Sequence, residues 1–329
     1  MTSTSPIPRA HIRTSPPPLL PPNRGALVFA WAFSLLVLAS CSSAPRLSIP
    51  VFEKDQFIGT LTVKRSFGHF TDASALSFDQ FGDLYVTDGG GNGLYKFNRK
   101  GDSLAAVVAQ GHDHGQFDRP LGVDASLTNS VAVADRNNYR IEVFSRDLIY
   151  QSTIEGHAPG SQIQFGYPSA VCRSTTGYYY VIDGERHRLI AFNPATGVQR
   201  AFTTVADEHH YELFPRDIAL DAGEYVAVAD VNSGGIKLFN STGSTVKEVR
   251  YRPASEARMT VSGNDLVAFD HVANTVRLFD FRELTYAGSY SLPQELKNAV
   301  TVVKRDDELY VLTKDKVVVC SIHSASDLN

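Results

Sequence analysis

Short apolar runs rich in β-branched and aromatic residues recur between residues 57 and 320, separated by clusters of Gly, Asn and Asp. Such runs are typical of β-strands joined by tight turns. One kind of run recurs six times, ending at Asp88, Asp135, Asp183, Asp230, Asp270 and Thr313. These ends are 47, 48, 47, 40 and 43 residues apart, so the sequence predicts a repeated unit.

Each unit contains further strands. A second run follows a polar turn and ends at Phe97, Phe144, Phe192, Phe239, Phe279 and Cys320 in the six copies. A shorter run precedes each copy, at residues 75–78, 121–123, 169–171, 217–220, 259–261 and 299–303. A weaker fourth run follows several copies. Four strands in each of six units predict an all-β protein with the architecture of a six-bladed β-propeller.

The two ends of the repeated region are expected to pair. Only nine residues, SIHSASDLN, follow Cys320, and they are too polar for a good outer strand. Residues 57–63, FIGTLTV, precede the first unit and lack another partner. We therefore predict that this N-terminal strand closes the last blade, that the propeller covers residues 57–320, and that residues 321–329 form a C-terminal tail.

The first 50 residues have a different composition, with nine of the 16 prolines. Arg9, Arg13 and Arg24 precede an uncharged stretch from Gly25 to Cys41. This stretch is shorter than the roughly 20 apolar residues of a membrane-spanning helix. A basic leader, a short apolar segment and small residues at its end are typical of an export signal.

The end of this segment, Leu38-Ala39-Ser40-Cys41, resembles the lipobox of bacterial lipoproteins. The resemblance implies a signal peptide over residues 1–40, a lipidated Cys41, and a tether over residues 41–56. An uncleaved anchor helix is the alternative. In both cases the folded part is exported and held at a membrane, and the absence of Asp after Cys41 favours the outer membrane.

The charge balance bears on partners. A net charge of −4 and a pI near 6.2 argue against a nucleic-acid partner.

An exported protein can form disulfides, but the propeller places Cys172 and Cys320 in different blades. We therefore expect both to be buried free thiols.

Two units carry a family resemblance. Residues 115–144 (GQFDRPLGVDASLTNSVAVADRNNYRIEVF) resemble an NHL repeat along most of their length, and residues 165–192 are a second good copy. The units near Phe70 and Phe214 keep the entry phenylalanine, whereas the last two units are degenerate. The resemblance implies a propeller but says little about activity, because propellers host many functions.

The repeated aspartates suggest either a ring of catalytic or metal-binding acids or a structural device. Each aspartate ends a strand and begins a turn, where a short carboxylate accepts backbone N–H bonds. Arg140 and Arg188 follow five residues after Asp135 and Asp183. We therefore favour a structural role, with an arginine partner in two blades.

The segments that enter the innermost strands carry candidate ligand-binding residues. Asp72, Arg119, Tyr167 and Arg216 lie two residues after an entry phenylalanine, and Arg258 falls nearby in a degenerate unit. At the mouth of a central channel they would hold an anion or carboxylate. The alternative is that they pair with the aspartates and join neighbouring blades.

Several histidines precede innermost strands, and His114 and His210 are candidate ligands for zinc or calcium. Their distances from the following phenylalanine differ, which favours solvated loop histidines instead. No cofactor is therefore predicted.

Three functions fit these observations. The first is a lipid-anchored, non-catalytic binding or scaffold propeller that contacts another protein of the bacterial envelope. The second is an enzyme, a metal-assisted lyase or lactone hydrolase with its site at the channel mouth. The third is capture of a soluble anion by the arginines. The sequence lacks G-x-S-x-G, H-E-x-x-H and P-loop motifs, which favours the first.

Overall fold

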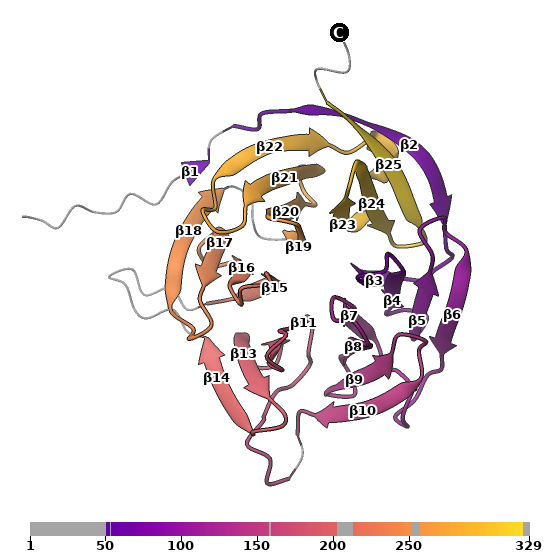
Figure 1. Cartoon of the computed structure of the whole chain (residues 1–329), viewed down its shortest axis with the longest axis vertical. Coiled ribbons are helices and arrows are strands. Elements are labelled where there is room, and N and C mark those ends of the chain that lie inside the picture. Colours follow the sequence, from indigo (N-terminus) through magenta and orange to yellow (C-terminus); the bar gives the residue numbers. More distant parts are fainter. Residues whose placement is uncertain (1–50, 53, 158, 203–212, 252–256, 325–329) are drawn as a thin grey trace, which may run out of the picture. The chain divides into compact units, whose positions relative to one another are not determined.

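The computed structural model describes residues 51–52, 54–157, 159–202, 213–251 and 257–324. They form six antiparallel sheets of four principal strands each. Figure 1 shows these sheets arranged as blades around a central axis, with the innermost strands β3, β7, β11, β15, β19 and β23 nearest that axis. The predicted six-bladed β-propeller is confirmed.

The first three blades follow the chain in order. Blade 1 contains β3 (Ala73–Phe78), β4 (Leu84–Asp88), β5 (Gly93–Phe97) and β6 (Ser103–Val108). Blade 2 contains β7 (Pro120–Asp124), β8 (Ser130–Asp135), β9 (Arg140–Ser145) and β10 (Tyr150–Glu155). Blade 3 contains β11 (Val171–Arg173), β12 (Tyr179–Asp183), β13 (Arg188–Asn193) and β14 (Val198–Phe202).

The next three blades include the closure of the ring. Blade 4 contains β15 (Pro215–Leu220), β16 (Val226–Asp230), β17 (Gly235–Phe239) and β18 (Thr245–Tyr251). Blade 5 contains β19 (Arg258–Ser262), β20 (Asp265–Asp270), β21 (Thr275–Asp280) and β22 (Tyr286–Ser291). Blade 6 contains β23 (Ala299–Arg305), β24 (Glu308–Thr313), β25 (Val317–Ser324) and β2 (Gly59–Phe67).

The N-terminal strand closes the last blade, as predicted. β2 pairs antiparallel with β25, from Gly59 opposite Ser324 to Phe67 opposite Val317. The closing strand therefore begins and ends later than the predicted residues 57–63. β25 also continues to Ser324, so the last sheet reaches beyond the predicted boundary at Cys320.

Residues just before β2 also lie against the propeller, although the sequence assigned residues 41–56 to a tether. β1 (Val51–Phe52) pairs parallel with β18 in blade 4, and Phe57 forms a bridge to Ser289 in blade 5. Figure 1 shows β1 beside β18 at the rim. Lipidation of Cys41 and the signal peptide concern residues outside those that the structure describes.

Strand alternation explains the uninterrupted apolar runs. Successive side chains of a strand point to opposite faces of its sheet, and each blade lies between two others. Val131 and Val133 of β8 pack in a cluster with blade 1, whereas Ala132 and Ala134 pack in a cluster with blade 3. Among the described residues, buried apolar side chains form six clusters, each between two neighbouring blades.

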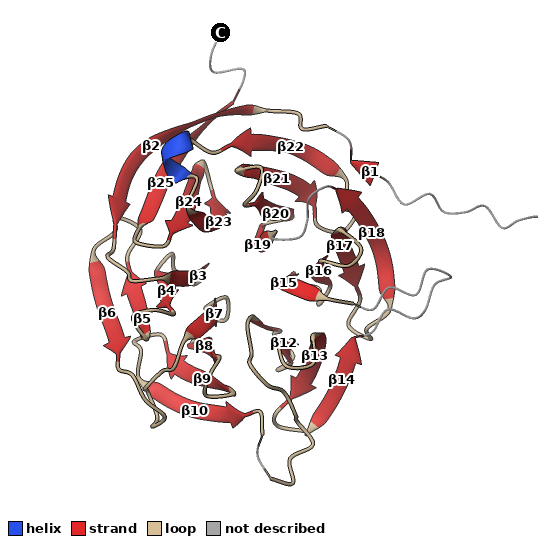
Figure 2. Ribbon diagram, turned by 180° about the vertical axis from the view of Figure 1, so that it is seen from behind, coloured by secondary structure: helices blue, strands red, loops and turns tan. Residues whose placement is uncertain are grey.

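Two elements depart from the regular four-stranded blade. The innermost strand of blade 3 begins at Val171 rather than Ser169, although Ser169 N still donates to Ile182 O at 3.2 Å. A short 3-10 helix (Gln294–Leu296) precedes β23 (Figure 2). No helix in the described ranges is long and apolar enough to cross a membrane.

The two described cysteines are free thiols, as predicted, but only Cys320 is fully buried as expected. Cys320 is buried, and burial raises the pKa of its thiol to about 11. Cys172 is half-buried beside the central axis, and desolvation likewise raises the pKa of its thiol.

Candidate functional site

One face of the propeller carries most of the candidate residues. We call it the entry face, because the innermost strands begin there. It comprises the segments that lead into those strands and the turns between each blade's second and third strands, at residues 89–92, 136–139, 184–187, 231–234, 271–274 and 314–316.

The repeated aspartates fasten these turns and segments together. Asp88 accepts hydrogen bonds from Thr71 N at 2.7 Å and Asp72 N at 2.8 Å. Asp135 accepts one from Asp118 N at 2.8 Å, and Asp230 accepts one from Phe214 N at 2.8 Å. Because a buried carboxylate needs such donors, the predicted structural role is confirmed.

The cation partners extend beyond those predicted from sequence. Arg140 Nε lies 3.0 Å from Asp135 Oδ2, and Arg188 Nε lies 2.9 Å from Asp183 Oδ2. Blades 4 and 5 place the cation two residues later in the third strand, on the same face of the sheet: Lys237 lies 2.8 Å from Asp230, and Arg277 lies 2.8 Å from Asp270. A search seven residues after each aspartate would have found both.

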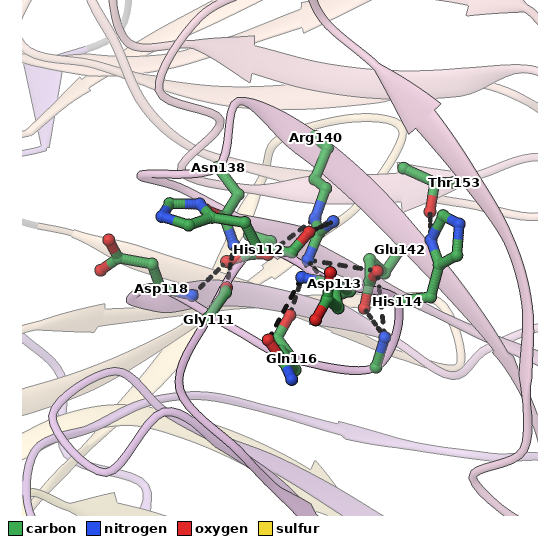
Figure 3. A network of polar contacts seen from close by, with 12 residues as sticks. Gly111, His112, Asp113, His114, Gln116, Asp118, Asn138, Arg140, Glu142 and Thr153 are labelled. Carbon is green, nitrogen blue, oxygen red and sulfur yellow. Dashed lines mark hydrogen bonds and ion pairs between the residues drawn. The ribbon is translucent and has the colours of Figure 1, made fainter.

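In blade 2 the arginine also holds the entry segment. The guanidinium of Arg140 is buried, and it donates to the carbonyl oxygens of His112 at 2.8 Å, Asp113 at 3.0 Å and Gln116 at 2.7 Å. Figure 3 shows this guanidinium between the strand and the loop. Charge-assisted bonds of this kind are strong, so they fix the segment that leads to Arg119.

Glu142 is a buried acid in the same network. Its carboxylate accepts from Gly115 N at 3.2 and 3.3 Å and lies 3.3 Å from Arg140 Nη2. Burial raises the pKa of Glu142 to about 7 despite the opposing effect of Arg140. The position therefore disfavours the ionised carboxylate near neutral pH.

The predicted metal ligands have different outcomes. The ring of His114 stacks on Tyr150 with centroids 4.6 Å apart, and its Nδ1 lies 3.3 Å from Thr153 Oγ1. His210 lies outside the described residues. Within the described part of the chain, no three His, Cys, Asp or Glu residues are grouped to hold a metal ion.

The five residues predicted at the channel mouth occupy different environments. Asp72 is exposed and lies 3.4 Å from Lys314 Nζ. Arg258 lines the central cavity and lies 3.9 Å from Asp217. Arg119 and Tyr167 lie at the ends of entry segments, whereas Arg216 lies within β15 (Pro215–Leu220).

Strand register explains this difference. Pro120 pairs with Asp135 and Pro215 pairs with Asp230. The counterpart of Arg119 in blade 4 is therefore Phe214, which precedes Pro215, and not Arg216. Phe214 is 36% exposed, so it is a surface residue rather than a core phenylalanine.

The central cavity has a volume of about 370 Å³ and is lined by all six innermost strands. Its charged lining residues are Asp124, Arg173, Asp217, Asp221, Glu224 and Arg258. Arg173 Nε lies 3.2 Å from Asp124, and Asp217 accepts from Met259 N at 2.7 Å. Burial raises the pKa of Asp217. These contacts join neighbouring blades across the cavity wall.

The entry face also carries a row of contacts between successive blades. Each contact joins the last residue of one blade's turn to the entry segment of the next blade. Asn92 Oδ1 accepts from Arg119 N at 2.8 Å. The rings of Tyr139 and Tyr167 lie 4.6 Å apart, with a hydroxyl–hydroxyl distance of 2.7 Å. The rings of His187 and Phe214 stack at 4.4 Å.

Other side chains complete this row. The guanidinium of Arg136 lies 4.9 Å from the centroid of the Tyr167 ring, within the range of a cation–π contact. The ring of His157 lies 5.1 Å from that of Tyr139. The entry-face patch, as we name it, consists of Arg119, Arg136, Tyr139, Tyr167, His187 and Phe214.

Four patch residues have left-handed backbone conformations: φ is 62° at Arg119, 55° at Tyr139, 46° at Tyr167 and 49° at His187. Such conformations cost about 1 kcal/mol or more for bulky residues. On the opposite face, Leu148, Leu284, Glu224 and Asp306 also have positive φ. The two leucine side chains are buried in the apolar clusters, whereas Glu224 is half-buried and Asp306 is exposed. The patch side chains are exposed or half-buried, so core packing does not offset their strain.

Sequence reasoning identified Arg119 and Tyr167 but missed the rest of the patch. A signal was present in the turns. The positions equivalent to Tyr139 and His187 hold Asn92, Gly234 and Asn274 in the other blades, and Asn and Gly are the residues that adopt positive φ most readily. An aromatic residue at such a position is therefore unusual.

Comparisons with known proteins show which proteins share part of the sequence or the fold. No family model matches the chain. The chain is 25% identical to "Protein brain tumor" of Drosophila melanogaster over 134 residues, which are 40% of this chain and 12% of that protein.

Solved structures of similar fold include a gluconolactonase from Xanthomonas campestris, with a TM-score of 0.59, 12% identity, and coverage of 84% of this chain and 97% of that chain. Virginiamycin B lyase from Staphylococcus aureus has a TM-score of 0.53, 14% identity, and coverage of 75% and 80%. Identities this low support a shared propeller fold alone. The chain is a six-bladed β-propeller with structural neighbours among enzymes of that architecture.

Proposed function

We propose that this chain is a lipid-anchored, extracytoplasmic binding module of the bacterial envelope and that the entry-face patch contacts its partner. The observation that carries the proposal is the set of strained residues Arg119, Tyr139, Tyr167 and His187, which lie together on the entry face with exposed or half-buried side chains. Bulky residues held in left-handed conformations without core packing in return are often found at functional sites. Aromatic residues and arginine also predominate among the energetically important residues of protein interfaces.

The anchoring part of the proposal rests on the sequence. The lipobox-like Leu38-Ala39-Ser40-Cys41 supports cleavage before Cys41 and lipidation there. Metabolic labelling with a radioactive fatty acid tests the anchor. We expect label on the wild type and none on Cys41→Ser. Label-free wild-type protein would refute the anchor.

A photo-crosslinking residue tests the binding surface. Placed at Arg186, which is exposed in the turn 184–187, it should capture a membrane protein in living cells. The same residue at Lys100, on the opposite face, is the matched control and should capture none. Equal capture from both positions, or none from Arg186, would contradict the proposed surface.

A further inference from the structure

The patch residues follow the order of the blades. Blade 2 supplies Arg119, Arg136 and Tyr139, blade 3 supplies Tyr167 and His187, and Phe214 begins blade 4. Neighbouring blades are related by rotation about the central axis, so equivalent positions lie along an arc. The contacts Asn92–Arg119, Tyr139–Tyr167 and His187–Phe214 are therefore successive points of one strip.

The chemistry of this strip changes along its length. At its blade 2 end Arg119 is exposed, and next to it the guanidinium of Arg136 lies over the Tyr167 ring. At the other end the rings of His187 and Phe214 are stacked, with His187 exposed and Phe214 36% exposed. The tyrosine pair lies between them.

The middle of the strip is rigid. Tyr139 donates a hydrogen bond to the hydroxyl of Tyr167, which raises the pKa of Tyr139. Arg136 covers the second ring, and the entry segment beneath is held by Arg140 (Figure 3). A preorganised aromatic surface loses little conformational entropy on binding.

From this arrangement we propose that the entry-face patch binds an extended segment of a partner protein that carries acidic residues next to an apolar or aromatic residue. The inference rests on the proposed function and specifies its partner. Carboxylates contact Arg119 and Arg136, and the apolar side chain packs on the His187 and Phe214 rings. The protein as a whole has a net charge of −4, and this disfavours the continuous phosphate backbone of a nucleic acid.

Fluorescence anisotropy with a labelled peptide tests the inference. The probe is three repeats of Glu-Glu-Gly-Phe, compared with three repeats of Lys-Lys-Gly-Phe and with a ten-nucleotide oligouridine, each added to the full chain in detergent. We expect saturable binding of the acidic peptide that weakens at least threefold between 50 and 300 mM salt, because exposed charges are screened. Neither comparison probe should bind as tightly.

Variants separate the two ends of the strip. Arg119→Glu should weaken acidic-peptide binding at least tenfold and remove most of the salt dependence, whereas Lys100→Glu, the same charge reversal on the opposite face, should leave binding unchanged. His187→Asn should weaken binding at least threefold without altering the salt dependence. Its new side chain matches Asn92 and Asn274 of other blades, so we expect it to fold.

Three results would overturn the inference: no binding of the acidic peptide, binding unaffected by Arg119→Glu, or tighter binding of oligouridine through the same arginine. The failure is distinguishable from failure of the proposed function. If the crosslinker at Arg186 captures a membrane protein while the acidic peptide does not bind, the surface stands and the partner chemistry is wrong.

Discussion

Blades 2 and 5 both end their second strand with a buried aspartate that pairs with an arginine, but the arginines hold different parts of the chain. In blade 2, Arg140 is the first residue of β9, and it joins Asp135 to the carbonyl groups of its own entry segment. In blade 5, Arg277 is the third residue of β21. It joins Asp270 to Asp55, which is 222 residues away in the N-terminal segment.

The difference shows how one repeated charge pair serves two purposes. A shift of two residues keeps the arginine on the same face of the strand while it redirects its remaining donors. In blade 2 those donors fix the loop that presents Arg119, and in blade 5 they fasten the N-terminal segment at the rim. The proposed binding residue Arg119 therefore follows an entry segment that is held by arginine contacts within the same blade.

We expect the largest loss of stability when the contacts of Arg140 within blade 2 are removed. Arg140→Met leaves Asp135 and Glu142 buried without their cation, and both side chains are fully buried. Removing one member of a buried ion pair costs about 3–5 kcal/mol, and we expect urea denaturation to show a loss of that size. Lys247→Met, which removes an exposed pair with Glu283, should cost about 1 kcal/mol or less. Equal losses would mean that the Arg140 network does not stabilise blade 2.

The remote contacts should contribute less, because Asp55 is partly exposed. Asp55 Oδ1 and Oδ2 lie 2.8 and 3.0 Å from Arg277. Asp55→Asn should lower the free energy of unfolding by about 1–2 kcal/mol. A double-mutant cycle with Arg277→Met should give a coupling energy of about 1 kcal/mol. Additive single effects would show that the Asp55–Arg277 contact does not help to hold the N-terminal segment.

Glu142 makes blade 2 sensitive to pH. Burial raises its pKa to about 7 in the folded protein, compared with 4.5 for a glutamate in the unfolded chain. The folded state therefore binds more protons between these values, and stability falls as pH rises from about 4.5 to 7. Glu142→Gln should remove this fall, measured as the difference between variant and wild-type unfolding free energies across that range.

Glu308 provides a control with the opposite sign. Its hydrogen bonds with Arg65 and Lys64 outweigh its burial and lower its pKa to about 2. Its contribution is present above about pH 4.5 and is lost as pH falls toward 2. Glu308→Gln should therefore change how the free energy of unfolding depends on pH below about 4.5 and leave its pH dependence between 4.5 and 7 unchanged. A pH profile of Glu142→Gln parallel to that of the wild type would contradict the role given to Glu142.

The sequence was sufficient to predict the fold because repetition averages out local ambiguity. Six copies of a strand ending at Asp88 and its equivalents indicated the blades, and the leftover strand before blade 1 indicated how the ring closes. The attachment of residues 51–52 and 54–58 was not predictable in the same way. It includes the contact of Asp55 with Arg277, two residues that share no repeat position.

The candidate site was only partly predictable, because it depends on backbone conformation. Arg119 and Tyr167 were found by counting from an entry phenylalanine, but counting failed in blade 4, where strand register makes Phe214 the counterpart and places Arg216 within β15. Tyr139 and His187 come from turns whose positive φ is not visible in a single residue's identity. Comparing the same turn position across blades would have identified them.

The most direct test of the entry-face patch is Tyr139→Asn, followed by thermal melting and acidic-peptide binding on one preparation. Asn tolerates the left-handed conformation that strains Tyr139 at φ 55°. We predict that the melting temperature is unchanged or rises by a few degrees, as expected for relief of about 1 kcal/mol, while peptide affinity falls at least fivefold. A lower melting temperature with unchanged binding would show that Tyr139 serves the fold and that the patch is not a recognition surface.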